Sequence, residues 1–122
     1  MNIDRIERTA QYFHDAHRTG KHFAPTPEEH RPRNLQEAYA AQHRYVELSS
    51  TSSPPIAGYK IAVTSQVIQE LVGISHPCLG MIRSGSVQTS PANLLESAFQ
   101  HVAIECEIAF TLKSNLEGIQ DK

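Results

Sequence analysis

The stretch AGYKIAVTSQVIQELVG, residues 57–73, changes its hydrophobic period halfway along and so predicts two different elements. Side chains over residues 57–64 alternate between two faces, which is the period of a strand. Ser65 can cap a short helix, whose apolar residues recur at helical spacing until Gly73 ends it. The stretch therefore predicts a chain that mixes strands with helices.

The residues that precede this stretch are predicted to be helical. Apolar side chains recur at helical spacing over residues 3–19, and Gly20 supplies a stop. After a proline-containing loop, Asn34 and Glu37 form an N-x-x-E start that resembles a capping box and predicts a second helix. The composition of SSTSSPP, residues 49–55, is typical of a surface connection between this helical part and a mixed remainder.

The carboxyl-terminal segment HVAIECEIAFTLK, residues 101–113, alternates most regularly of all and predicts a strand over residues 101–112. Its apolar side chains are expected to face a core, and they are Val102, Ile104, Cys106, Ile108 and Phe110. A shorter strand is predicted over residues 79–82, after the turn HPCLG. We therefore expect an α+β fold in one domain, residues 1–122, with a helical part over 1–48 and a strand-rich part over 57–113.

Composition excludes several classes of function. The chain has 122 residues and a net charge of -2, without a basic stripe, so we expect no nucleic-acid partner. No segment approaches the roughly 20 apolar residues of a membrane helix, and the charged amino terminus is unlike a signal peptide. The two cysteines, Cys78 and Cys106, lack metal or disulfide spacing, so a reducing cytoplasm is the expected compartment.

Three charged residues stand within the predicted strands. Glu105 and Glu107 lie two positions apart, so their side chains share a face and their Cα atoms are about 6.6 Å apart. They are either an ordinary solvated pair or a pair that a cation such as Mg²⁺ or Mn²⁺ neutralises. Lys60 is either an edge lysine whose stem lies along apolar surface or a lysine that faces a pocket.

Four motifs together resemble a known family: NLQEAYAAQHRYV, GYKIAVTSQVIQELVG, HPCLGMI and IECEIAFTL, in this order. They resemble the 2-keto-4-pentenoate hydratases and 4-oxalocrotonate decarboxylases, a branch of the fumarylacetoacetate hydrolase superfamily. The resemblance covers residues 34–113 and implies the amino-terminal half of a fumarylacetoacetate-hydrolase-like fold.

The resemblance also implies a function and its residues. Glu105 and Glu107 would bind a catalytic Mg²⁺ or Mn²⁺, Lys60 would be catalytic, and Lys60 and Ser65 would contact the substrate. The implied reaction is the hydration of a small unsaturated 2-oxo or 2-hydroxydienoic acid of aromatic catabolism by a homo-oligomeric enzyme. Decarboxylation of a 2-oxo acid is the alternative within the same branch.

The sequence departs from the family pattern in two places. Cys78 stands in PCLG where many relatives have an acid, and Ala62 replaces a common glycine. Relatives also continue beyond this point and supply a third acidic ligand there. The expectation is therefore an incomplete hydratase-like domain, and the alternative from another class is an inactive module that associates through an exposed strand edge.

Overall fold

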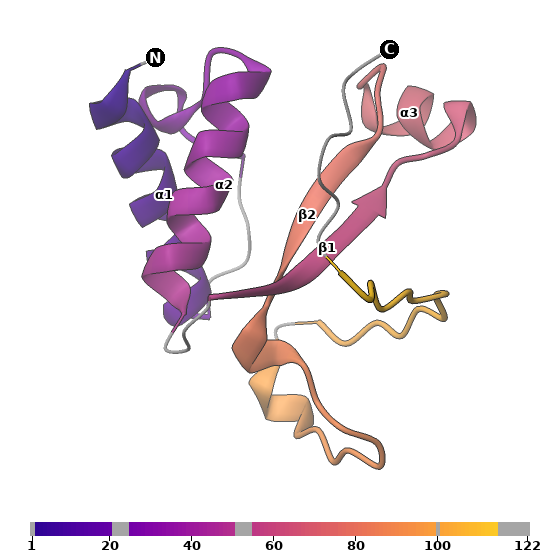
Figure 1. Ribbon diagram of the computed structural model, residues 1–122. Helices are drawn as coiled ribbons and strands as arrows, with labels where there is room; N and C mark the ends of the chain where they lie inside the picture. The colour runs from indigo at the N-terminus through magenta and orange to yellow at the C-terminus, as the bar shows by residue number, and fades with distance from the viewer. Residues whose placement is uncertain (1, 21–24, 51–54, 100, 115–122) are drawn as a thin grey trace.

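The computed structural model describes residues 2–20, 25–50, 55–99 and 101–114. Its elements are the helices α1 (Ile3–Arg18), α2 (Leu35–Ser49) and α3 (Gln66–Val72), the strands β1 (Ile56–Ala62) and β2 (Cys78–Arg83), and the short 3-10 helices η1 (Glu28–His30), η2 (Ser84–Ser86) and η3 (Glu96–Ala98). The predicted α+β class with a helical amino-terminal part is thereby confirmed. Figure 1 shows α1 and α2 on one side and the β1–β2 hairpin, with α3 at its far end, on the other.

Both long helices begin at side-chain caps, and the one at Asn34 was predicted from the sequence. The side-chain oxygen of Asn2 accepts a hydrogen bond from the Arg5 backbone N–H at 3.1 Å, and that of Asn34 accepts one from the Glu37 N–H at 2.9 Å. The second cap departs from a capping box in one respect. The Glu37 carboxylate accepts from the backbone N–H of Arg33, at 3.0 Å, rather than from that of Asn34.

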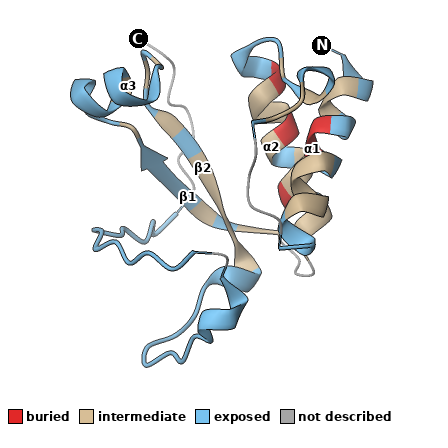
Figure 2. Ribbon diagram, turned by 180° about the vertical axis from the view of Figure 1, so that it is seen from behind, coloured by how far each residue is buried: buried red, intermediate tan, exposed pale blue. Residues whose placement is uncertain are grey.

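Helices α1 and α2 lie side by side and run in the same direction. Three contacts advance together along both helices: Asn2 with Glu37, Glu7 with Arg44, and His14 with Ser49. The buried residues of the described chain all lie between or beside these helices, and they are Thr9, Ala10, Glu37, Ala41 and Val46. Figure 2 places every buried residue on this helix pair. The core that the structure describes is therefore helical.

The sheet has two antiparallel strands, with Lys60 opposite Gly80 and Ile61 opposite Leu79. One face carries Tyr59, Ile61, Leu79 and Met81, and the other carries Lys60, Ala62, Cys78, Gly80 and Ile82. The connection between the strands contains α3, which begins after the cap Ser65 and ends at Gly73 in the left-handed conformation, with φ of 76°. The predictions for residues 57–73 are confirmed.

Side chains of α2 cover the outer edge of β2. The Tyr39 hydroxyl accepts a hydrogen bond from the Leu79 backbone N–H at 3.1 Å, and the Gln42 amide donates to the Leu79 carbonyl at 3.0 Å. Because the backbone groups of Leu79 point toward α2, Ile61 and Leu79 form a pair without mutual hydrogen bonds. The backbone groups of Ile61 therefore point away from β2, along the other edge of the sheet.

The strand that the alternating pattern predicts over residues 101–112 is not formed. These residues are described and lie outside any helix or strand. The side chains that were expected in a core are exposed, with Ile104 at 89%, Ile108 at 85% and Phe110 at 86%. Alternation sets the two faces of a strand, but a strand also needs a neighbour for its backbone hydrogen bonds, and no described segment pairs with this one.

No helix in the described parts of the chain has both the length and the apolar character needed to cross a membrane.

Candidate functional site

Lys60 lies in the middle of β1, opposite a glycine that leaves room for its side chain. A Cβ atom on Gly80 would stand 3.0 Å from the Cγ and 3.3 Å from the Cε of Lys60. The aliphatic stem therefore crosses β2 at the position where Gly80 has no side chain. Residue 60 itself is exposed, so its amine is accessible to a ligand on this face of the sheet.

Gly80 is a residue that the sequence reasoning missed. The glycine was part of a predicted turn and short strand, with no relation to Lys60. Its signal was present, however, because glycine inside a strand often marks a close approach of another group. The pairing register, which brings residues 60 and 80 together, could not be predicted from the sequence.

The end of β1 is held by a tight turn. Val63 has a positive φ of 58°, a conformation that β-branched residues rarely adopt, and the Gln69 amide donates a hydrogen bond to its carbonyl at 3.0 Å. The Ser65 hydroxyl then accepts from the Ile68 backbone N–H at 3.4 Å. Ser65 thus acts as the predicted helix cap, and its contact with substrate stays a prediction.

Glu105 and Glu107 lie in the exposed segment that follows η3. In the described part of the chain, no ion pair or hydrogen bond joins either carboxylate to Lys60. No direct polar contact therefore links the three residues in the described structure, and their roles stay predictions.

The donor chemistry of this pair suits a hard divalent cation, because Mg²⁺ and Mn²⁺ prefer carboxylate oxygens. The described structure does not complete such a site, since no group of three or more His, Cys, Asp or Glu side chains capable of holding a metal occurs among the residues described. Among the described residues, Glu105 and Glu107 therefore have no third side chain of these types beside them, and their binding of a metal stays a prediction.

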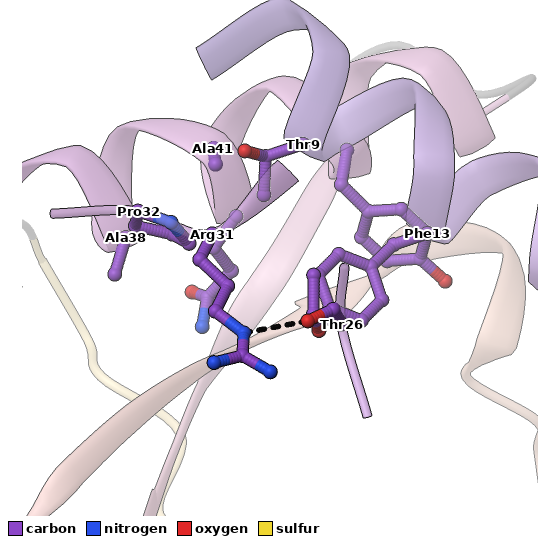
Figure 3. Close-up of a pocket in the computed structure, with 9 residues that line it drawn as sticks. Thr9, Phe13, Thr26, Arg31, Pro32, Ala38 and Ala41 are labelled. Atoms are coloured by element: carbon purple, nitrogen blue, oxygen red, sulfur yellow. Dashed lines mark hydrogen bonds between the residues drawn. The ribbon is translucent and has the colours of Figure 1, made fainter. Parts of the chain in front are cut away.

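A separate pocket of about 560 Å³ lies between the two long helices and the segment that joins them (Figure 3). It is lined by Thr9, Phe13, Thr26, Arg31, Pro32, Ala38, Ala41, Gln42 and Tyr45. The Arg31 side chain lies across it and donates a hydrogen bond from Nε to the Thr26 carbonyl at 2.6 Å. None of the residues predicted to be functional lines this pocket.

Glu37, a carboxylate of the helix pair with a lowered pKa, has a structural role. The hydrogen bond from the Arg33 backbone N–H lowers the pKa of Glu37, and the Asn2 N–H and the Arg5 charge lower it further, although burial acts in the opposite direction. Glu37 thus joins the first turn of α1, the first turn of α2 and the segment between them. It is not a candidate for acid–base chemistry.

Comparison with known proteins found no matching family model and no matching solved structure. Among curated proteins, the chain is 28% identical over 115 residues to the 2-hydroxyhexa-2,4-dienoate hydratase of Comamonas testosteroni, covering 93% of this chain and 44% of that protein. It is 29% identical over 124 residues to the 2-keto-4-pentenoate hydratase of Paraburkholderia xenovorans strain LB400, covering 98% and 45%. It is 30% identical over 84 residues to the 2-oxo-hept-4-ene-1,7-dioate hydratase of Escherichia coli, covering 69% and 32%. The chain spans less than half the length of these relatives.

Proposed function

This chain is a homologue of the 2-keto-4-pentenoate hydratases, and from that premise we propose that it takes part in the hydration of a small unsaturated 2-hydroxydienoic acid in cytoplasmic aromatic catabolism. One observation carries the proposal: the similarity extends over 93% to 98% of the chain. The names of these relatives favour hydration over decarboxylation. Mg²⁺ or Mn²⁺ is the proposed cofactor, with Glu105 and Glu107 as ligands.

The proposed reaction has two steps. A 2-hydroxydienoic acid first becomes a 2-oxo acid, as its enol loses the hydroxyl proton and a carbon gains one. Water then adds across the double bond that remains. Both steps need a proton donor or acceptor beside the substrate, and such a group typically contributes 10²- to 10⁴-fold to the rate.

Lys60 is the residue proposed for this proton transfer, or for holding the substrate carboxylate. Its stem lies over Gly80, and its amine is accessible on a sheet face where Ala62 and Cys78 are small and Ile82 lies beyond Gly80. Small neighbours leave space beside the amine for a substrate of a few carbon atoms. Ser65, which follows the strand, is the second proposed substrate contact.

The reaction can be tested by following the ultraviolet absorbance of 2-hydroxypenta-2,4-dienoate with Mg²⁺ or Mn²⁺ present. We expect Lys60→Met to lower kcat/KM by roughly 10²- to 10⁴-fold. Lys113→Met, which alters another exposed lysine, should leave it unchanged. Equal turnover by Lys60→Met and the native chain would remove Lys60 from the proposal.

Metal binding is tested by a measurement separate from turnover. Titration with Mn²⁺, followed by electron paramagnetic resonance, should reveal binding that is lost when Glu105→Gln and Glu107→Gln are combined. The matched control is Glu96→Gln, which alters an exposed acid in η3. Binding that survives the double substitution would place the ion elsewhere.

A binding module without catalytic activity is the second candidate function. It is favoured by the apolar side chains that the sheet, α3 and the last described segment leave exposed. This candidate predicts no turnover under any metal condition, together with self-association of the chain.

A further inference from the structure

The pocket between α1, α2 and the segment that joins them, which we call the helix pocket, is formed by one continuous part of the chain. Each residue described as lining it lies between positions 9 and 45. Its volume of about 560 Å³ falls within the roughly 300–1,000 Å³ of small-molecule sites. Neither the β1–β2 hairpin nor the segment after η3 adds a described side chain to the lining, so the pocket is separate from the proposed hydration site.

The segment that joins the two helices forms one wall of the helix pocket and is anchored to α1. The Thr9 hydroxyl donates a hydrogen bond to the His30 carbonyl at 2.7 Å, and the His30 ring stacks on Tyr12 with centroids 5.1 Å apart. Arg5 donates from Nη1 to the Arg31 carbonyl at 3.4 Å. The backbone at Arg31 is therefore held in place without a ligand, and a site formed in advance lowers the free-energy cost of binding.

The lining of the helix pocket is mainly apolar and includes two aromatic rings. Phe13 belongs to α1 and Tyr45 to α2, while Ala38 and Ala41 of α2 contribute small side chains that leave space between them. Figure 3 shows Pro32 and Ala38 toward one side of the pocket and Phe13 toward the other. Aromatic side chains bind flat rings through offset or edge-to-face contacts, so a planar apolar ligand suits this lining.

Arg31 is the one charged side chain among the described residues of the lining. Its Nε donates to the Thr26 carbonyl at 2.6 Å, which directs the guanidinium across the pocket (Figure 3). No carboxylate of the described residues forms an ion pair with Arg31. Its terminal nitrogens are therefore available to a ligand, and the fork of a guanidinium matches a carboxylate in geometry as well as in charge.

The acids that precede Arg31 in the chain do not line the helix pocket. Glu28 and Glu29 line a neighbouring hollow, where Arg31 is accompanied by Arg5 and Arg33. The described lining of the helix pocket thus carries one positive charge and no negative charge, so a ligand with a single negative charge complements it.

We propose that the helix pocket binds a small aromatic monocarboxylate, with the carboxylate on the Arg31 guanidinium and the ring against Phe13 and Tyr45. A neutral ring would gain nothing from the guanidinium, and a second negative charge would enter an apolar lining without a partner. The proposal does not depend on the hydration reaction, because the two sites share no described residue.

Titration of the native chain with 2-naphthoate tests the site without substrate or metal. Two-dimensional ¹H–¹⁵N NMR follows the backbone amides and the Nε–H of Arg31. We expect saturable shifts in α1, α2 and residues 25–33, with a Kd on the order of 1 mM or tighter. The neutral analogue 2-naphthamide should bind about three- to ten-fold more weakly, because it lacks the charge-assisted hydrogen bonds to Arg31.

Variants of the lining identify the groups that bind the ligand. Arg31→Met should abolish the preference for 2-naphthoate over 2-naphthamide. The matched control is Arg33→Met, which alters an exposed arginine outside the lining and should keep that preference. Ala38→Phe should fill the space and weaken both ligands by roughly ten-fold or more. Circular dichroism should give the same helix content for all four proteins.

Three results would overturn the proposal. The first is the absence of saturable shifts with 2-naphthoate at millimolar concentration. The second is equal affinity for 2-naphthoate and 2-naphthamide in the native chain, or a preference that Arg31→Met leaves intact. The third is a set of shifts confined to the β1–β2 hairpin and α3, whose exposed apolar side chains offer a different surface to an aromatic ring.

Discussion

A residue on the neighbouring strand determines the position of the Lys60 side chain. Gly80 has no Cβ, and the lysine stem occupies the space that a Cβ would fill. The contact involves the flexible part of a lysine, so a larger residue at position 80 would displace the stem at little cost in stability. At the residue scale, the orientation of Lys60 is therefore set by packing and can be altered separately from its charge.

Gly80→Ala should move the Lys60 side chain without unfolding the protein. The new Cβ would lie 3.0 Å from the lysine Cγ, which is too close for an ordinary contact. The control is Gly58→Ala, whose Cβ would meet only the Ile82 Cδ1 atom, at 3.9 Å. The NMR signal of a ¹³C-methylated Lys60 should shift in Gly80→Ala and stay in place in Gly58→Ala. Unshifted signals in both would contradict the stem's placement over Gly80.

Glu37 gives the helix pair a pH dependence whose sign follows from its lowered pKa. A carboxyl group with a lower pKa in the folded state stabilises the fold above its unfolded pKa, near the ordinary 4.5, and loses that effect as the pH falls through the folded pKa. Glu37→Gln should therefore lower Tm at pH 7, and the difference from the native protein should shrink below pH 4.5. Thermal scans from pH 7 to below pH 4.5 test this difference in Tm, with Glu96→Gln as the control. A difference that is constant with pH would contradict the electrostatic role.

At the element scale, the helices could be predicted from sequence because their determinants are local. The caps Asn34 and Ser65 and the stop at Gly73 lie next to the segments that they delimit, and the structure places all three as predicted. The strand over residues 101–112 could not be predicted in the same way. Alternation identifies its faces, but the hydrogen-bond partner is supplied by residues distant in sequence, and so is the register that joins Lys60 to Gly80.

The cap of α2 makes a measurable contribution to stability. Asn34→Ala removes the acceptor for the Glu37 backbone N–H and should destabilise the protein by about 1 kcal/mol, within the usual range for a lost N-cap. Asn34→Asp keeps an acceptor at the same position and is the matched control. Urea denaturation followed by helical circular dichroism measures both. An alanine variant as stable as the native chain would mean that water replaces the cap fully.

At the scale of the whole molecule, the described chain consists of a packed helix pair and a hairpin with exposed faces (Figure 2). The residues predicted to be functional all lie in the exposed part, so their assembly depends on what covers it. The chain is similar in sequence to hydratases, and in the described structure no hydrogen bond or ion pair joins Lys60 to Glu105 or Glu107.

The central proposal is that this chain takes part in the hydration of a 2-hydroxydienoic acid. Mass spectrometry of the product formed from 2-hydroxypenta-2,4-dienoate in ¹⁸O-labelled water, with Mn²⁺ present, tests it most directly. The account predicts a product heavier by one water molecule that carries the label on its new hydroxyl group, and formation of this product should be impaired in Lys60→Met. A product that has lost carbon dioxide, or substrate that returns unchanged from the metal-supplied chain, would contradict it.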